Sequence, residues 1–462
     1  MSLNSFAFVF FLPFVVVINF ILPRKYRYIW LCAASLFFYL SNDVRFAAGL
    51  AVCTVTSYVS GLLLEKGEGI RRKIILILCI FANIATLFLF RYSFLHSIFV
   101  PLGMSFYALQ SMGYVIDVYR RDMKAERNLL KYTLFVAFFP TVISGPIQRG
   151  KVLLQQIGEG RDFDYAKARS GLYYLLWGYL LKLVMANQLG GMVDYAYGDY
   201  ENMPGATLLW ATILYAIQLY CDFAGYSALA IGTSKILGFD IGDNFTQPYF
   251  AVSVKDFWRR WHISLSSWLR DYVYIPLGGN RKGIWRKRIN LMITFLVSGL
   301  WHGSGANFLV WGALHGIYQI AEDIVPQKGD KKKGVVSRVV GGIVTFLLVD
   351  FAWLFFRAES LSQAATILHR IVFSFQLKEM TYYGSYLLGG TKLNLVLMLA
   401  GILFVFLIDM LHEKKIVMEN VTACRVNIVI RWVGYIALTL LILLVVVRNY
   451  GQAASTFIYA RF

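Results

Sequence analysis

Long apolar runs recur along the whole chain and constrain its fold more than any other feature. A run of about 17–25 apolar residues suffices to span a bilayer as a helix, and the chain holds roughly ten such runs. Hydrophobic residues make up 58% of the 462 residues and charged residues only 15%. This pattern excludes a soluble globular protein and predicts an all-α integral membrane protein, with one membrane domain over residues 1–462.

Basic residues give the chain a formal net charge of +19, but they are scattered through the short loops between the apolar runs. Basic loops of this kind orient membrane spans, whereas a nucleic-acid site gathers its cations on one face. The positive-inside rule therefore predicts that residues 24–27 and 65–73 form cytoplasmic loops, with the N-terminus outside the cell. No nucleic-acid partner is expected, and the lipid bilayer is predicted to surround the apolar helices.

Five cysteines are too few and too scattered for a disulfide framework, and none forms a CxxC motif. Most of them lie in or beside apolar runs, so we expect them to pack in the core: Cys32, Cys53, Cys79, Cys221 and Cys424.

Two polar or broken segments interrupt the first half of the chain. Residues 101–120 are too polar to face lipid, and SGPIQRG breaks the apolar segment 129–143 with Gly145 and Pro146. Broken backbone at membrane depth is tolerated only where protein or a water-filled cavity surrounds it. The pattern therefore favours a central cavity or tunnel in the helix bundle.

Residues 257–276 alternate bulky apolar residues with arginines at helical spacing. This predicts one helix in the membrane interface, with Trp258, Trp261 and Leu265 buried and Arg259 and Arg270 facing water or phosphate.

Residues 289–324 are apolar almost throughout, which predicts a membrane span with His302 near its middle. An ionisable side chain at membrane depth is costly and is therefore a functional candidate. His315 follows 13 residues later, which is about 220° around one continuous helix. We therefore expect these two histidines to point to different sides, so no shared metal site is predicted.

His262 and His302, each preceded by a tryptophan, are the candidate catalytic residues. A neutral imidazole can accept a proton at physiological pH, as an alcohol attacking an acyl thioester requires. The alternative is that both are core histidines bonded to neighbouring polar groups. Neither an HExxH zinc motif nor a GxSxG nucleophile elbow accompanies them.

Asp222 lies among apolar residues in LYCDFAGYSALAIG, where it either contacts substrate or serves a structural hydrogen bond. Gly225 and Gly232 of the same segment would allow a neighbouring helix to approach closely.

Two stretches, FWRRWHISLSSWLRDYVYIPLGG and SGLWHGSGANFLVWGALHG, resemble the signature of membrane-bound O-acyltransferases, in particular the bacterial alginate O-acetyltransferase branch. Further similar segments are PLGMSFYALQSMGYVIDVYR, FFPTVISGPIQR, DFAGYSALAIG, FAWLFFRAESLSQA and FIYARF, so the resemblance covers nearly the whole chain.

The resemblance implies about eleven spans, with interfacial and broken helices around a tunnel, in a bacterial cell membrane. It places the family's hallmark histidine at His302 and the second variable position at His262. It also implies an acyl donor that enters from the cytoplasm as a substrate, either acetyl-CoA or an acylated carrier protein, and no bound cofactor. The acyl group would pass to an extracellular partner protein or polysaccharide.

The remaining candidates for substrate contact are Arg259 and Arg260, which would hold anionic donor phosphates, and the indoles of Trp258 and Trp301. FIYARF and the WLFFRA segment favour acetylation over D-alanylation of teichoic acid, which shares the same motifs. A non-enzymatic transporter of an acylated lipid or sugar would also use intramembrane His and Asp residues.

Overall fold

A computed structural model describes residues 1–92, 101–324, 334–378, 392–414 and 427–448 of the chain. Every regular element within these residues is helical, which confirms the all-α prediction. Six of the described helices are long and apolar enough to cross a membrane: residues 44–66, 69–90, 205–236, 335–357, 396–413 and 429–447. The predicted count of about eleven spans stays a prediction.

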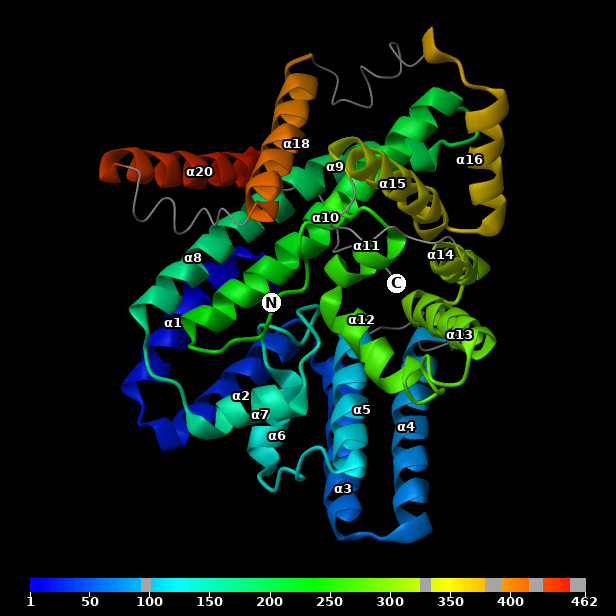
Figure 1. The fold of residues 1–462 in the computed structure, drawn as a ribbon. Helices are drawn as coiled ribbons and strands as arrows, with labels where there is room; N and C mark the ends of the chain where they lie inside the picture. The colour runs from blue at the N-terminus through cyan, green and yellow to red at the C-terminus, as the bar shows by residue number, and fades with distance from the viewer. Residues whose placement is uncertain (93–100, 325–333, 379–391, 415–426, 449–462) are drawn as a thin grey trace. The chain divides into compact units, whose positions relative to one another are not determined.

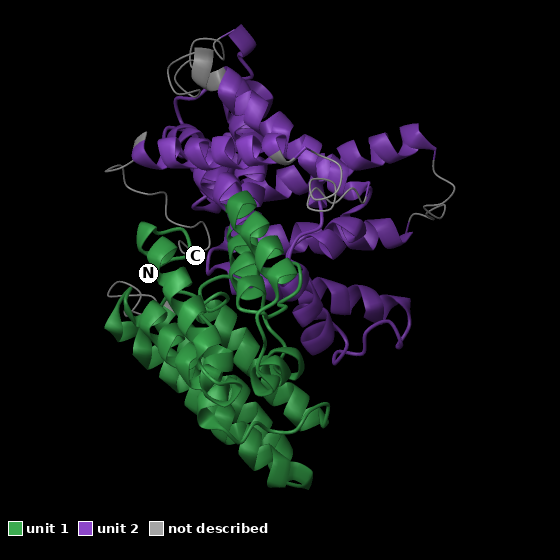
Figure 2. Ribbon diagram, turned by 90° about the vertical axis from the view of Figure 1, so that its left-hand side faces the viewer, with its two compact units in different colours: residues 1–178, 226–243 green, residues 179–225, 244–462 purple. Residues whose placement is uncertain are grey.

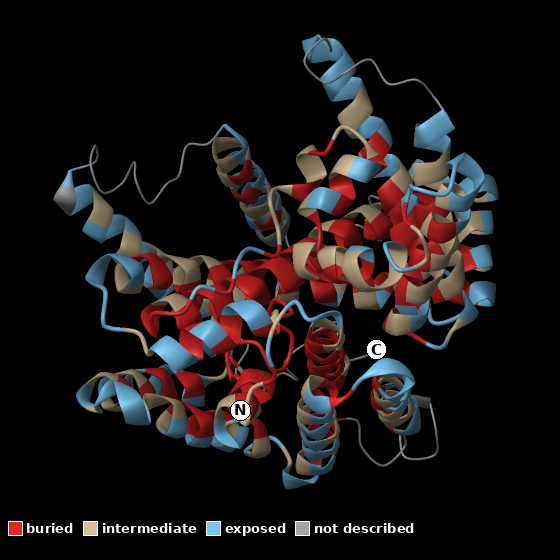
Figure 3. Ribbon diagram, turned by 60° about the horizontal axis from the view of Figure 1, so that its bottom comes forward, coloured by how far each residue is buried: buried red, intermediate tan, exposed pale blue. Residues whose placement is uncertain are grey.

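The surface of these helices fits a bilayer. Most helices carry buried residues on one side and exposed residues on the other (Figure 3). On α4 (Gly69–Tyr92) the exposed side is apolar, with Ile77, Phe81 and Ile84 each more than half exposed. Large apolar side chains in such a row face lipid rather than water in a stable membrane protein.

The chain divides into two compact units (Figure 2). Unit 1 holds residues 1–178 and 226–243, and unit 2 holds residues 179–225 and 244–462. The boundary falls within α10 (Gly205–Ile236), the helix that contains Asp222 and Gly232. The single membrane domain over residues 1–462 stays a prediction.

Unit 1 contains the N-terminal helices, of which α3, α4 and α5 pack side by side (Figure 1). The basic residues 24–27, expected in a loop, form the first turn of α2, and only two residues separate α3 from α4. Besides α4 and the last part of α10, the unit 1 elements are α1 (Phe6–Ile21), α2 (Arg24–Leu40), η1 (Val44–Phe46), α3 (Ala47–Lys66), α5 (Met104–Arg120), α6 (Leu129–Ala137), α7 (Gly150–Glu159) and α8 (Tyr165–Tyr179).

The predicted break at Gly145 and Pro146 is present but begins earlier than expected, because α6 ends at Ala137, within the apolar segment 129–143, and α7 begins at Gly150. Protein surrounds the intervening backbone, as the principle for membrane depth requires. Gln110 of α5 forms a hydrogen bond with this backbone: its Oε1 accepts from the Gln148 N–H at 3.3 Å. Gln148 in turn donates to the Pro146 and Ile241 carbonyls, at 2.8 and 3.1 Å.

Gly232 confirms the prediction of close helix packing within unit 1. A Cβ atom at this position would lie 2.6 Å from the Gly171 carbonyl oxygen of α8 and 2.9 Å from the Leu175 nitrogen. Real Cβ atoms do not approach so closely, so only glycine fits.

Unit 2 contains the later helices together with two π-helical segments. Its elements, besides the first part of α10, are η3 (π, Leu180–Ala186), α9 (Asn187–Gly198), η4 (Pro248–Phe250), α11 (Val254–Arg260), α12 (Ile263–Leu269), η5 (π, Arg270–Tyr274), α13 (Ile284–His302), α14 (Ala306–Ile324), α15 (Val335–Arg357), α16 (Leu361–Phe373), α18 (Lys392–Glu413) and α20 (Ile428–Arg448).

The single interface helix expected over residues 257–276 is wrong. The backbone breaks between α11 and α12, and the helix after Leu269 continues as the π segment η5. The predicted burial holds nevertheless, since Trp258, Trp261 and Leu265 are buried while Arg259 and Arg270 are exposed.

The single span expected over residues 289–324 is also wrong. Residues 303–305 form a turn, and α13 and α14 pack against each other as a helical hairpin (Figure 1). Glycines on both arms allow this contact, because a Cβ atom at Gly299 would collide with the Phe308 carbonyl and one at Gly312 with the Phe295 carbonyl.

Candidate active site

His302 is the last residue of the 19-residue helix α13 and is buried. Three aromatic rings meet its imidazole edge to face: Trp301 at 4.7 Å, Trp311 at 4.9 Å and Phe356 at 5.0 Å between ring centroids. The carbonyl end of a helix carries a partial negative charge, which stabilises a cation within its last turn. The end of α13 therefore favours an imidazolium at His302, whereas its burial opposes one.

His262 lies at the break between α11 and α12, with a left-handed backbone conformation of φ 45°. Asn244 holds this break: its carbonyl accepts from the Ile263 backbone N–H at 3.0 Å. Its side-chain Oδ1 accepts from the Ser264 backbone N–H at 3.2 Å and from the Ser264 hydroxyl at 2.9 Å. Neither the tryptophan nor the histidine at the break is a helix-breaking residue type, so a partner 18 residues earlier determines the local backbone.

The same Asn244 oxygen fixes the tautomer of His262, whose Nδ1 lies 3.2 Å away. Because Oδ1 is an acceptor in its bonds to Ser264, Nδ1 must carry the proton, and Nε2 of the neutral ring then carries the lone pair. Burial lowers the pKa of His262 to about 3, so the ring is neutral at physiological pH.

Trp301 brings the two predicted catalytic residues together. Its ring centroid lies 6.1 Å from that of His262 and 4.7 Å from that of His302. Phe223 of α10 covers His262 from another direction, edge to face at 4.6 Å. The candidate active site of unit 2 thus consists of two histidines on one indole, surrounded by aromatic rings.

The expectation that His302 and His315 point to different sides is wrong, because it assumed one continuous helix. The hairpin folds α14 back on α13, and the Trp311 ring lies 4.9 Å from His302 and 5.0 Å from His315. Trp258 donates its indole N–H to His315 Nδ1 at 3.2 Å, and its predicted contact with substrate stays a prediction.

Asp222 forms a buried ion pair with Lys182, a residue of the π segment η3. Both side chains are at most 3% exposed. The structure thus gives Asp222 a partner that the sequence analysis did not identify, although Phe223, the next residue, contacts His262. A lone lysine within the apolar run LLKLVMA was the signal, since a buried charge calls for a partner.

The two arginines of α11 differ in what they contact. Arg260 forms hydrogen bonds with both carboxylate oxygens of Glu413, at 2.6 and 3.2 Å, and an ion pair with Asp256 at 3.1 Å. Arg259 is exposed. Arg260 is therefore neutralised by protein carboxylates, and Arg259 is the better placed of the two to meet an anionic substrate.

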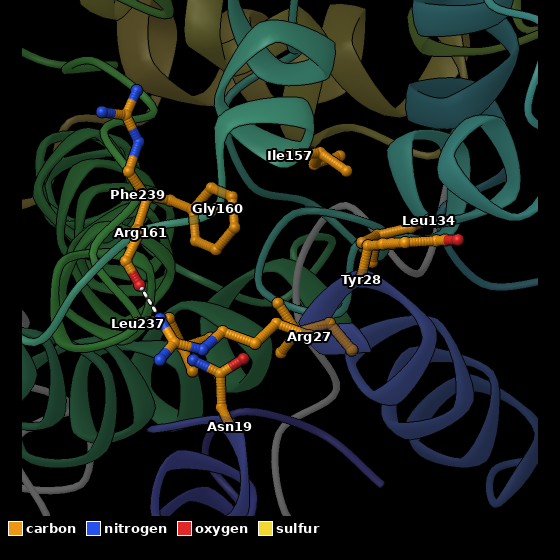
Figure 4. Close-up of a pocket in the computed structure, with 10 residues that line it drawn as sticks. Asn19, Arg27, Tyr28, Leu134, Ile157, Gly160, Arg161, Leu237 and Phe239 are labelled. Atoms are coloured by element: carbon orange, nitrogen blue, oxygen red, sulfur yellow. Dashed lines mark hydrogen bonds between the residues drawn. The ribbon is translucent and has the colours of Figure 1, made fainter. Parts of the chain in front are cut away.

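No group of three or more His, Cys, Asp or Glu side chains that could hold a metal ion occurs among the residues that the structure describes. A small hollow of about the size of one water molecule lies in unit 1 (Figure 4). Arg27 lines it and donates to the Arg161 carbonyl, while Asn19 and Phe239 close other sides. None of the predicted site residues lines this hollow.

An all-helical membrane fold with a histidine pair in an aromatic setting fits a membrane-embedded transferase. Residues 120–361, which include His262, His302 and Asp222, match the model of the MBOAT, membrane-bound O-acyltransferase family. The chain belongs to this family, and the protein is an O-acyltransferase.

Several curated relatives agree with this assignment. The chain is 35% identical to the "Probable alginate O-acetylase AlgI" of Pseudomonas putida, over 100% of this chain and 99% of that protein. It is 31% identical to the "Peptidoglycan O-acetyltransferase" of Helicobacter pylori, over 74% of this chain and 73% of that protein. It is 27% identical to the "Teichoic acid D-alanyltransferase" of Bacillus subtilis, over 57% of this chain and 70% of that protein.

Proposed function

We propose that this enzyme transfers an acetyl group from a thioester donor, taken up from the cytoplasm, toward hydroxyl groups of a polysaccharide outside the cell membrane. The donor would be acetyl-CoA or an acylated carrier protein, and a partner protein would receive the group or hand it on. Two relatives named as acetyl-transferring enzymes align over larger shares of this chain than the D-alanyltransferase does, which supports acetylation over D-alanylation.

One observation carries the proposed division of roles: His302 ends a long helix, whereas His262 is held neutral by burial and by its bond to Asn244. We assign His302 as the general base, since the end of α13 stabilises the imidazolium that forms on it. His262 would accept a hydrogen bond from the acceptor hydroxyl at Nε2 and orient it, because a ring with so low a pKa holds a proton poorly.

The reaction then follows from these roles. His302 takes the proton of the hydroxyl as its oxygen attacks the thioester carbonyl carbon, and a tetrahedral intermediate forms. This intermediate collapses with cleavage of the carbon–sulfur bond, and the leaving thiolate takes the proton back from His302. The acetyl ester and the free thiol are the products.

The aromatic surroundings serve the same chemistry. The rings of Trp301, Trp311 and Phe356 cover the His302 imidazole and limit the access of water, which would otherwise hydrolyse the thioester. The indole of Trp301, shared by both histidines, is the surface against which the acetyl group would lie.

Arg259 would bind the phosphates of the donor, and Arg260 contributes less because its charge is already paired. The basic segments at residues 24–27 and 65–73 and an N-terminus outside the cell would place the donor on the cytoplasmic side.

The experiment that tests the base assignment is acetyl transfer by His302→Ala, measured with a labelled thioester donor and an oligosaccharide acceptor. Loss of a general base lowers turnover by about 10²–10⁴-fold, so we expect a loss of this order with retained folding. His262→Ala should lose less, and His262→Asn should retain part of the activity because an amide still accepts a hydrogen bond.

His369→Ala is the matched control, because this histidine is exposed on α16 of the same unit. Its turnover should equal that of the wild type. A correctly folded His302→Ala variant with near wild-type turnover would overturn the assignment of the base.

A further inference from the structure

His315 is completely buried at the centre of an aromatic cluster in unit 2. Three tryptophans approach its imidazole, with centroid separations of 5.0 Å to Trp258, 5.0 Å to Trp311 and 6.1 Å to Trp353. Phe295 stacks on it at 6.0 Å. A leucine or phenylalanine would fill such a space without burying a polar ring, so the imidazole calls for another explanation.

The hydrogen bond from Trp258 determines the tautomer of His315. An indole N–H is only a donor, so His315 Nδ1 is the acceptor and carries the lone pair. In the neutral ring the proton is then on Nε2. His315 thus satisfies a buried indole N–H that no apolar side chain at this position would satisfy.

Trp311 connects this arrangement to the base. Its fully buried ring has an edge-to-face contact with His302 at 4.9 Å and another with His315 at 5.0 Å, and Trp258 also contacts it at 5.8 Å. A bond that fixes Trp258 and His315 therefore fixes Trp311, and with it one wall of the His302 imidazole.

We propose that His315 is a positioning residue for the reaction, which orients the His302 imidazole through Trp311. The proposal rests on the assignment of His302 as the base. It predicts that the hydrogen-bond acceptor at position 315, and not the filled volume alone, determines turnover.

Two substitutions separate these contributions. His315→Asn keeps an acceptor near the position of Nδ1, whereas His315→Leu is apolar and leaves the Trp258 N–H unsatisfied. Misplacement of a catalytic group by about 1 Å can cost about 10²-fold in rate. We expect His315→Leu to lower kcat by about 10–100-fold with the donor KM unchanged, and His315→Asn to retain most of kcat.

The assay is thioester turnover by purified enzyme in detergent, with kcat expressed per folded molecule from the monodisperse fraction. Trp258→Phe removes the donor of the same bond and should also lower kcat. Adding it to His315→Leu should cost little more, because the bond is already lost. The control is His369→Leu, in which leucine replaces an exposed histidine; it should leave kcat unchanged.

Equal kcat for His315→Asn and His315→Leu would overturn the proposal, as would a lower melting temperature with unchanged kcat, since either result indicates packing alone. If His315→Leu does not fold, the kcat of Trp258→Phe decides: a loss supports the proposal, and wild-type turnover overturns it. His302→Ala in the same assay reports separately on the base assignment, so the two failures are distinguishable.

Discussion

The buried ion pair between Lys182 and Asp222 allows a quantitative prediction. Both charges are removed from water, with side chains 1% and 3% exposed. Removal of one partner leaves the other charge buried without its counter-ion, which costs about 3–5 kcal/mol, whereas replacement of both by apolar residues is often neutral or stabilising. The pair thus predicts opposite results for the single and the double substitution.

We expect Lys182→Met, which keeps most of the length of the side chain, to lower the melting temperature in detergent micelles by about 3–5 °C. The double variant Lys182→Met/Asp222→Leu should recover most of that loss. Intrinsic fluorescence during a thermal ramp at constant detergent concentration provides the measurement. The control is Arg24→Gln, which breaks the exposed pair with Asp162 and should change the melting temperature little.

An unchanged melting temperature for Lys182→Met, or a double variant as unstable as the single one, would refute this reasoning. The double variant also decides the role of Asp222, which the sequence left open between substrate contact and structure. A stable double variant with wild-type turnover assigns Asp222 to structure, and a stable but inactive one assigns the Lys182–Asp222 pair to the reaction.

Three further predictions concern the interface, the helix contact and pH. Leu265→Asp should abolish folded protein in a size-exclusion assay, since Leu265 is buried, whereas Ser266→Asp on the half-exposed side should stay folded; equal yields would contradict the burial assignment. Gly232→Ala should lower the melting temperature, while Gly191→Ala, which meets open space, should raise it slightly or leave it unchanged; the reverse order would contradict the close contact. A histidine titrates near 6.5 when unfolded, so the low pKa of His262 means that only the unfolded state binds its proton between pH 6.5 and about 3. Stability is therefore lost as the pH falls through this window, by up to about 1.4 kcal/mol per pH unit. Melting temperatures between pH 7 and pH 5 should fall less for His262→Asn than for the wild type, and parallel curves would refute this origin.

The sequence predicted those features that depend on local pattern. The helical spacing of Trp258, Trp261 and Leu265 correctly predicted that all three are buried, although Leu265 lies beyond the break, on a second helix. Gly232 correctly predicted a close contact between helices, because a residue without a side chain lets a neighbouring helix approach.

The features that the sequence did not give depend on distant partners. The break at His262 needs Asn244, and the burial of Asp222 needs Lys182, 40 residues away. The turn at residues 303–305 reverses the chain and so places Trp311 of α14 beside His302 of α13, a contact that the period of one continuous helix does not predict. Periodicity describes one helix, whereas these contacts join different elements of the chain.

The hairpin of α13 and α14 also has a consequence for the order of assembly during synthesis. Its two arms, together with α11 and α12, contribute both histidines of the site, Trp301, Trp311 and His315 from fewer than a hundred consecutive residues. A nascent chain that has reached Ile324 therefore already carries these groups, and only Trp353 and Phe356 of α15 arrive later. Local contacts form early because little chain must be closed into a loop, so the histidine cluster is expected to form before the last helices leave the ribosome.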